Sequence, residues 1–90
     1  MLDLTKYNLD DDDILFLLQT EDWCINCQSE IILEYQGKSF VLEPSGKSVQ
    51  VVEVADEVAG KYESFDDLLL NYKIDGKPLI ELVKDLNYGE

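Results

Sequence analysis

The sequence contains no histidine and no arginine, so all seven of its basic residues are lysines. Without an imidazole group, neither a Ser-His-Asp triad nor a Cys-His dyad can form. Without a guanidinium group, the bidentate arginine clamp on phosphate is excluded as well. The chain also lacks a GxxxxGK[ST] phosphate-binding loop and a GxGxxG dinucleotide motif. These absences remove several widespread classes of enzyme chemistry.

Long apolar runs are also missing. No run approaches the roughly 18–20 residues with which a helix crosses a bilayer. Residues 1–13 are acidic, whereas signal peptides begin with basic residues. A chain of 90 residues with 46% apolar and 10% aromatic residues is typical of one small globular domain. We therefore expect a single domain, residues 1–90, in the cytoplasm.

Basic residues are scarce relative to acidic ones: twenty Asp and Glu face seven Lys, which gives a formal net charge of −13. Direct binding to nucleic acid requires clustered Lys and Arg, and an anionic membrane would repel the chain. A basic partner, such as the nucleic-acid groove of another protein, would be attracted. Solubility alone also accounts for an acidic surface. Charge thus predicts a protein partner with a basic surface, without nucleic-acid or membrane binding, and leaves the oligomeric state open.

The N-terminal region has a helix-start pattern. Four aspartates, residues 10–13, precede five apolar residues, 14–18. Aspartate caps free amides at a helix N-terminus, and leucine outnumbers β-branched residues in the apolar run. We predict a helix over about residues 10–19. A buried strand over residues 14–18 remains the alternative, because so short a run does not settle its structure by periodicity.

Residues 29–54 alternate between apolar and polar side chains in three runs, which predicts a three-stranded antiparallel meander. A two-residue turn at Gln36-Gly37 would place Leu33 opposite Phe40 on an apolar face.

The second turn of the meander falls at residues 44–46. We expect a loop of even length, which places Val49 beside Leu42 on the same apolar face, because a three-residue loop with a bulge would reverse the register. Residues 55–63 are predicted to be a polar loop.

Two short helices with apolar stripes are predicted after the sheet. Ser64 with Asp67 resembles a capping box at the start of a helix over about residues 64–72. Asp75-Gly76 is predicted to end the helical pattern, and Pro78 suits the start of a second helix over about residues 78–86. The stripes are Phe65, Leu68, Leu69 and Tyr72, then Leu79, Leu82, Val83 and Leu86. The fold class is therefore α+β, with a core that includes Phe40, Leu68, Leu69, Leu82 and Val83.

The segment FDDLLLNYKIDGKPL, residues 65–79, follows the predicted hairpins. Together they resemble a class of small, acidic, uncharacterised bacterial proteins over about residues 29–86. Capping, turn geometry and core packing account for every matching residue. The resemblance therefore implies an architecture and carries over no activity and no binding residues.

Cys24 and Cys27, in the segment EDWCINC, raise the possibility of a redox site. The Trp-Cys-x-x-Cys pattern, with YKIDGKPLIELV downstream, resembles thioredoxins and would place Pro78 as their cis-proline. Cys24 would then be an exposed thiolate at a helix N-terminus, and Cys27 would resolve the mixed disulfide. Against this, the residues after Cys27 alternate as in a hairpin, and the chain ends soon after Pro78.

The same two cysteines supply only half of a structural zinc site, which needs four ligands. Carboxylates, or the Cys24 and Cys27 pair of a second chain, would have to complete it. The favoured interpretation is two ordinary, reduced cysteines near the start of a strand, with Trp23 or Ile25 packed against the sheet edge. On that interpretation no catalytic residue, metal ligand or cofactor is predicted.

The leading functional hypothesis is a non-enzymatic, intracellular module that binds another macromolecule. In its most specific form the acidic surface imitates the charge of nucleic acid, as some phage-encoded inhibitors do, in a phage or defence setting. The alternatives are a thioredoxin-like dithiol oxidoreductase that uses Cys24 and Cys27, and a dimer bridged by zinc through the same residues.

Overall fold

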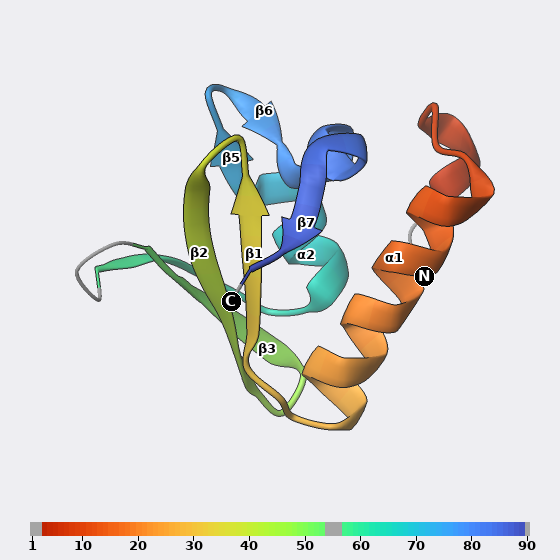
Figure 1. Cartoon of the computed structure of the whole chain (residues 1–90). Coiled ribbons are helices and arrows are strands. Elements are labelled where there is room, and N and C mark those ends of the chain that lie inside the picture. Colours follow the sequence, from red (N-terminus) through yellow and green to blue (C-terminus); the bar gives the residue numbers. More distant parts are fainter. Residues whose placement is uncertain (1–2, 54–56, 90) are drawn as a thin grey trace.

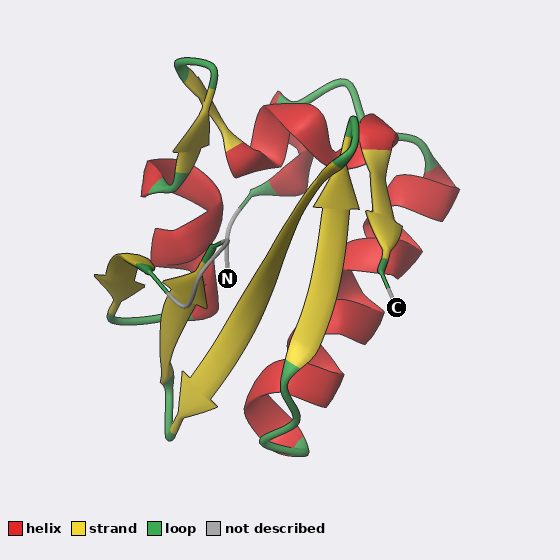
Figure 2. Ribbon diagram, turned by 60° about the vertical axis from the view of Figure 1, so that its left-hand side comes forward, coloured by secondary structure: helices red, strands yellow, loops and turns green. Residues whose placement is uncertain are grey.

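The computed structural model describes residues 3–53 and 57–89. Its helices gather on one side of an antiparallel sheet (Figures 1 and 2). In chain order the elements are η1 (Leu4–Lys6), α1 (Asp11–Glu21), the π-helical turn η2 (Asp22–Asn26), β1 (Ile31–Tyr35), β2 (Lys38–Ser45), β3 (Ser48–Val52), β4 (Val58–Tyr62), α2 (Phe65–Asn71), β5 (Lys73–Ile74), β6 (Lys77–Pro78), the 3-10 helix η4 (Leu79–Asp85) and β7 (Leu86–Tyr88).

The N-terminal helix is confirmed, and the strand alternative over residues 14–18 is wrong. Asp10 caps α1: the Asp13 amide donates to the Asp10 side chain at 3.0 Å, and the Asp10 amide donates to the Asp13 side chain at 3.2 Å. This reciprocal arrangement satisfies two amides that the helix itself leaves unbonded. Helical backbone continues beyond the predicted end through η2 to Asn26.

The first hairpin forms in the predicted register. Leu33 lies opposite Phe40. The turn residues Gln36 and Gly37 have φ angles of 47° and 85°, and positive φ at both positions is what a type I′ hairpin turn requires. Leu33 and Phe40 are buried, so this face of the sheet forms one wall of the core.

The second hairpin has the even loop that was predicted, but its register differs. Leu42 pairs with Val51 instead of Val49, because the turn lies at Gly46-Lys47 and Pro44 belongs to β2. Pro44 is tolerated there since it lies beyond Leu42, the last β2 residue that pairs with β1, so its missing N–H removes no bond of that pairing. The same residues still face the core.

The sheet has five strands in the order β4-β3-β2-β1-β7, which corrects the predicted three-stranded meander over 29–54. β4 lies within the predicted polar loop 55–63, part of which, like Val54, falls outside the described residues. Its side chains are mostly exposed because it is an edge strand, so the sequence there lacks a strong apolar alternation. β7 pairs with the other side of β1 and forms the opposite edge.

The helix predicted over 64–72 is confirmed as α2, with Ser64 accepting a hydrogen bond from the Asp67 amide at 3.0 Å. The helix predicted over 78–86 is instead the 3-10 helix η4, and Pro78 precedes it as its N-cap. Its buried residues Leu79 and Leu82, like Ile80 and Val83, are three positions apart, which matches the period of a 3-10 helix. Leu86 leaves the helix because it pairs with Tyr35 in the sheet.

The core lies between the sheet and the layer made by α1, α2 and η4. All five of the predicted core residues are buried: Phe40, Leu68, Leu69, Leu82 and Val83. They belong to a single apolar cluster that also takes in residues of α1 and β7. Among the described residues, no helix is both long and apolar enough to span a membrane.

Candidate interaction surface

The two cysteines lie at the C-terminal end of the α1 helical segment. Cys24 sits in η2 with 0% of its surface exposed, Cys27 is exposed immediately after it, and both thiols are free. Burial raises the pKa of the Cys24 thiol to about 11. A reactive cysteine of the Cys-x-x-Cys type needs access to solvent and a following helix N-terminus that stabilises its thiolate. Here Cys24 is enclosed, and the next element after Cys27 is the strand β1.

The surroundings of the cysteines also differ from a metal site. Among residues 3–53 and 57–89, no three Cys, Asp or Glu side chains come together as a metal-binding group. The neighbouring Trp23 packs on Tyr88 of edge strand β7, with ring centroids 5.4 Å apart. Packing of Trp23 or Ile25 against the sheet edge was predicted, and Trp23 is the one whose ring contacts edge strand β7.

The carboxylates have few cationic partners within the described part of the chain. Lys84 bridges Asp10 and Asp13 at 3.4 and 2.7 Å, and Lys38 lies 3.0 Å from Glu53. The remaining described carboxylates have no lysine within ion-pair distance, and none of them is fully buried. Most of the described carboxylates therefore face solvent without a lysine partner.

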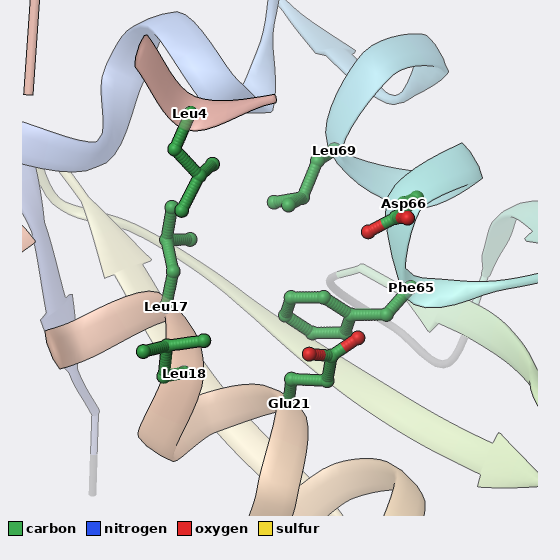
Figure 3. Close-up of a pocket in the computed structure, with 7 residues that line it drawn as sticks. All are labelled: Leu4, Leu17, Leu18, Glu21, Phe65, Asp66 and Leu69. Atoms are coloured by element: carbon green, nitrogen blue, oxygen red, sulfur yellow. The ribbon is translucent and has the colours of Figure 1, made fainter. Parts of the chain in front are cut away.

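An apolar depression separates α1 from α2 (Figure 3), and we call it the α1–α2 groove. Five of the residues that line it are apolar and two are acidic: Leu4, Leu17, Leu18, Phe65 and Leu69, with Glu21 and Asp66. The space inside it is about 10 Å³, roughly what one water molecule needs. The side chains of the groove therefore fill it almost completely, and it is far smaller than a typical small-molecule site.

Glu21 and Asp66 come from different helices and lie at the same end of the groove, beside Phe65 (Figure 3). Partial burial, and then the negative charge of Asp66, raise the pKa of the Glu21 carboxyl above its usual value. No lysine occurs in α1, η2 or α2, and no described residue forms an ion pair with either carboxylate. The fold thus places two like charges near each other.

Exposed leucines occur on both helices that form the groove. Leu15 and Leu18 lie one turn apart on α1 with 63% and 40% of their surface exposed, and Leu18 also lines the groove. Leu70 of α2 is 39% exposed and lies four residues after Asp66, which places both on one side of that helix. Single exposed leucines are common on protein surfaces, and of these three only Leu18 lines the groove.

Two wider depressions lack this combination. One lies along β3 and β4, where the Gln50 side chain donates to Glu43 at 3.1 Å. The other lies between the N-terminal segment and η4, where Lys84 is already bonded to Asp13 at 2.7 Å. Their polar groups are at least partly paired with one another, so neither presents a set of converging free groups.

Sequence analysis identified the acidic surface but missed the groove. Glu21 and Asp66 are far apart in the chain, and Asp66 looked like an ordinary acid in the first turn of a helix. The one available signal was the apolar run at 14–18, which is longer than a single buried stripe of a helix needs and therefore leaves leucines exposed. No protein-family model, no curated protein and no solved structure was found to match this chain.

Proposed function

We propose that the chain is a non-enzymatic module that binds a partner protein with a basic surface. The observation that carries this proposal is that few carboxylates form ion pairs. In the described part of the chain, only Asp10, Asp13 and Glu53 have a lysine within 4 Å. The other carboxylates of the described residues form no ion pair with a lysine and can meet an external cation. Summed over a net charge of −13, they create a field that attracts basic surfaces and speeds encounter with them.

In its most specific form, the proposal is that the protein imitates the charge of nucleic acid and occupies the basic groove of a nucleic-acid-binding protein. Such a partner and its DNA or RNA would bind in a mutually exclusive manner. A partner that is basic for another reason would bind the chain without excluding nucleic acid.

Two steps test the proposal. First, the immobilised chain captures proteins from a lysate of its source organism, alongside a variant in which Asp11, Asp12 and Asp22 are replaced by asparagine. Second, the captured protein is purified and mixed with the chain. We expect a complex of fixed stoichiometry with a basic protein, an affinity that falls as salt rises, and weaker binding by the variant. Failure to reconstitute such a complex, or a complex indifferent to salt, would contradict the proposal.

Competition with DNA or RNA then decides the specific form. Nucleic acid that displaces the chain from its partner in proportion to its own affinity supports mimicry. A ternary complex with nucleic acid would exclude mimicry and leave the binding of a basic partner intact.

The dithiol and zinc alternatives lack a comparable observation. Cys24 is enclosed and its thiol pKa is raised, whereas nucleophilic attack and zinc binding both require the thiolate. Both alternatives have direct assays, namely disulfide reductase turnover and the metal content of the purified protein. Catalytic turnover or one equivalent of zinc per dimer would replace the present proposal.

A further inference from the structure

The edge strand β7 has backbone groups that no described residue bonds. The Gly89 amide donates to the Ile32 carbonyl at 2.9 Å. Bonded and non-bonded residue pairs alternate along an antiparallel ladder, so the next pair, Leu33 with Tyr88, is a non-bonded one. The N–H and C=O of Tyr88 therefore point away from β1, toward the free side of β7. No described strand lies on that side (Figure 2), and no hydrogen bond between described residues reaches either group.

Exposed apolar side chains lie on both faces of this edge. On the helix side, Tyr88 packs against Trp23 with ring centroids 5.4 Å apart, and 39% and 38% of their surfaces are exposed. On the opposite face, Ile32 is 36% exposed. Its side chain lies over Gly89, where an added Cβ would come 2.7 Å from the Ile32 Cγ2. Because side chains alternate along a strand, a strand placed beside β7 would meet apolar surface on both of its faces.

The opposite edge of the sheet, β4, is protected against such pairing. It carries Lys61, and its register with β3 shifts, as at a bulge, between Val51 and Val52. A lysine and a bulge are two devices by which natural edges avoid pairing with another chain. β7, with the sequence LNY, has neither of them. Its short length limits the number of backbone bonds it can offer, so the apolar side chains beside it must supply part of the affinity.

We propose that the free side of β7 is the docking site for an extended, basic segment of the partner protein, which adds to the sheet as a further strand. The inference rests on the proposed function and states where, and in what conformation, the partner is held. The segment would bond to the N–H and C=O of Tyr88 and to the C=O of Leu86, which points the same way. The Leu86 amide already donates to the Val83 carbonyl, which agrees with its pointing away from β1. Strand addition of this kind draws affinity from main-chain bonds and specificity from alternate side chains.

The charges around β7 favour a basic segment over a second copy of this chain. No lysine belongs to α1, η2, β1 or β7. Asp85 adjoins β7, Glu34 belongs to the part of β1 that pairs with it, and neither forms an ion pair with a described lysine. Lys84, next to Asp85 in sequence, is bonded to Asp10 and Asp13. A second copy would bring another net charge of −13 and would be repelled, whereas lysine or arginine in the added strand would be attracted.

The probe for the test is a short peptide of alternating valine and threonine with a lysine at each end. A second peptide has the same side chains on methylated backbone nitrogens, which cannot donate hydrogen bonds. A third has glutamate in place of each lysine. Each is titrated into the whole isotope-labelled protein and followed by NMR.

The lysine peptide should shift the amide signals of Asn87, Tyr88 and Gly89. It should also slow hydrogen exchange of the Tyr88 amide by at least about 5-fold, because that amide gains a hydrogen bond. The methylated peptide should bind at least about 10-fold more weakly, since the bonds to the Tyr88 and Leu86 carbonyls are lost. The glutamate peptide should also bind at least about 10-fold more weakly.

Two matched variants distinguish the two edges of the sheet. Ile32→Ala should weaken binding of the lysine peptide by about 3- to 5-fold, because it removes apolar surface beside β7. Val58→Ala removes a β-branched side chain that is 51% exposed on β4. It should change the affinity by less than about 1.5-fold. The exchange of the Tyr88 amide is measured on the wild type, so this evidence does not depend on how well either variant folds.

The outcomes separate this inference from the proposed function. Equal binding of the lysine and methylated peptides, unchanged exchange of the Tyr88 amide, or no binding of any peptide would overturn strand addition at β7. Equal weakening by Ile32→Ala and Val58→Ala would overturn β7 as the edge used. Equal binding of the glutamate peptide would overturn a basic occupant, and a dimer with its Tyr88 amide protected in the absence of peptide would make a second copy the occupant. Each of these results leaves the complex with a basic partner intact. Failure of the purified partner complex would overturn the proposed function, whatever the peptides do.

Discussion

The hydroxyl groups of Thr20 and Tyr88 lie 2.7 Å apart and connect the last turn of α1 to edge strand β7. Thr20 also lies 2.7 Å from the carbonyl of Phe16, to which its hydroxyl donates. The Tyr88 hydroxyl is therefore the donor to Thr20. Phe16 and Trp23 pack on the ring of the same tyrosine at centroid distances of 4.7 and 5.4 Å. One side chain thus holds the N-terminal helix against the last strand.

Replacing Tyr88 by phenylalanine should remove this hydrogen bond and keep the aromatic packing. Thr20 retains its bond to Phe16, so no buried group is left without a partner, and the free energy of unfolding should fall by about 0.5–1.5 kcal/mol. Urea denaturation measures the change. Asn87→Ala, at an exposed neighbour in β7, is the control and should change stability by less than about 0.5 kcal/mol. Wild-type stability of the Tyr88→Phe variant would show that the bond contributes nothing.

Replacing Leu82 by alanine should destabilise the fold by about 2–5 kcal/mol, through lost apolar burial and the cavity left behind. Leu82 is 4% exposed and belongs to the core cluster under the sheet. Leu15→Ala is the matched control, because the same atoms are removed from a leucine that is 63% exposed; its effect should stay within about 0.5 kcal/mol. A loss below about 0.5 kcal/mol for Leu82→Ala would mean that η4 does not pack as described.

The two cysteines should differ sharply in reactivity. With Cys24 buried and Cys27 exposed, an alkylating reagent near neutral pH should modify Cys27 in the native protein and reach Cys24 only after unfolding. Mass spectrometry of peptides counts the modification at each site. Rapid alkylation of Cys24 in the folded protein, together with turnover in a disulfide reductase assay, would instead identify an enzyme.

Cys24 should also make stability depend on pH in the alkaline range. Burial raises the pKa of its thiol from 9.0 to about 11, so the folded state holds its proton where the unfolded state has released it. This contribution is fully present below pH 9 and is lost as pH rises to about 11, by on the order of 2 kcal/mol. Cys24→Ala should lack this component of the alkaline decline. Identical pH profiles for the two proteins would contradict the raised pKa.

Replacing Glu21 by glutamine should stabilise the protein at neutral pH. The substitution removes a partly desolvated charge and its repulsion with Asp66, and an increase in melting temperature of about 1–4 °C is expected for a domain of this size. Differential scanning calorimetry measures the increase. Glu34→Gln should leave the melting temperature nearly unchanged. A lower melting temperature for Glu21→Gln would show that the carboxylate supports the fold.

Features set by neighbouring residues could be predicted from the sequence. The capping aspartates located α1, and Gln36-Gly37 located the first hairpin with its register. Features set by distant residues could not be predicted. β7 is three residues long and becomes a strand because β1 offers it an edge. The turn between β2 and β3 was misplaced because Pro44 normally indicates a loop, and only the end of β1 makes it acceptable in a strand.

The candidate site likewise has one feature that the sequence could predict and one that depends on residues distant in the chain. Excess negative charge is a property of composition and was visible at once. The groove depends on how α1 crosses α2, which brings together Glu21 and Asp66 from separate parts of the chain. Neither residue belongs to a sequence motif that indicates a functional site. Their proximity could be recognised only from the folded structure.

The three-residue strand β7 has a consequence for the behaviour of the protein at high concentration. β1 carries the segment IILEY, an apolar, β-branched stretch of the kind that adds to other strands edge to edge. Pairing with β7 occupies the hydrogen-bonding side of β1 that β2 leaves open. Fraying of β7 would expose that side while the rest of the sheet remains folded. While β7 is paired, β1 cannot pair with a strand of another molecule along this side. We therefore expect aggregation to begin when β7 separates from β1, before the whole domain unfolds.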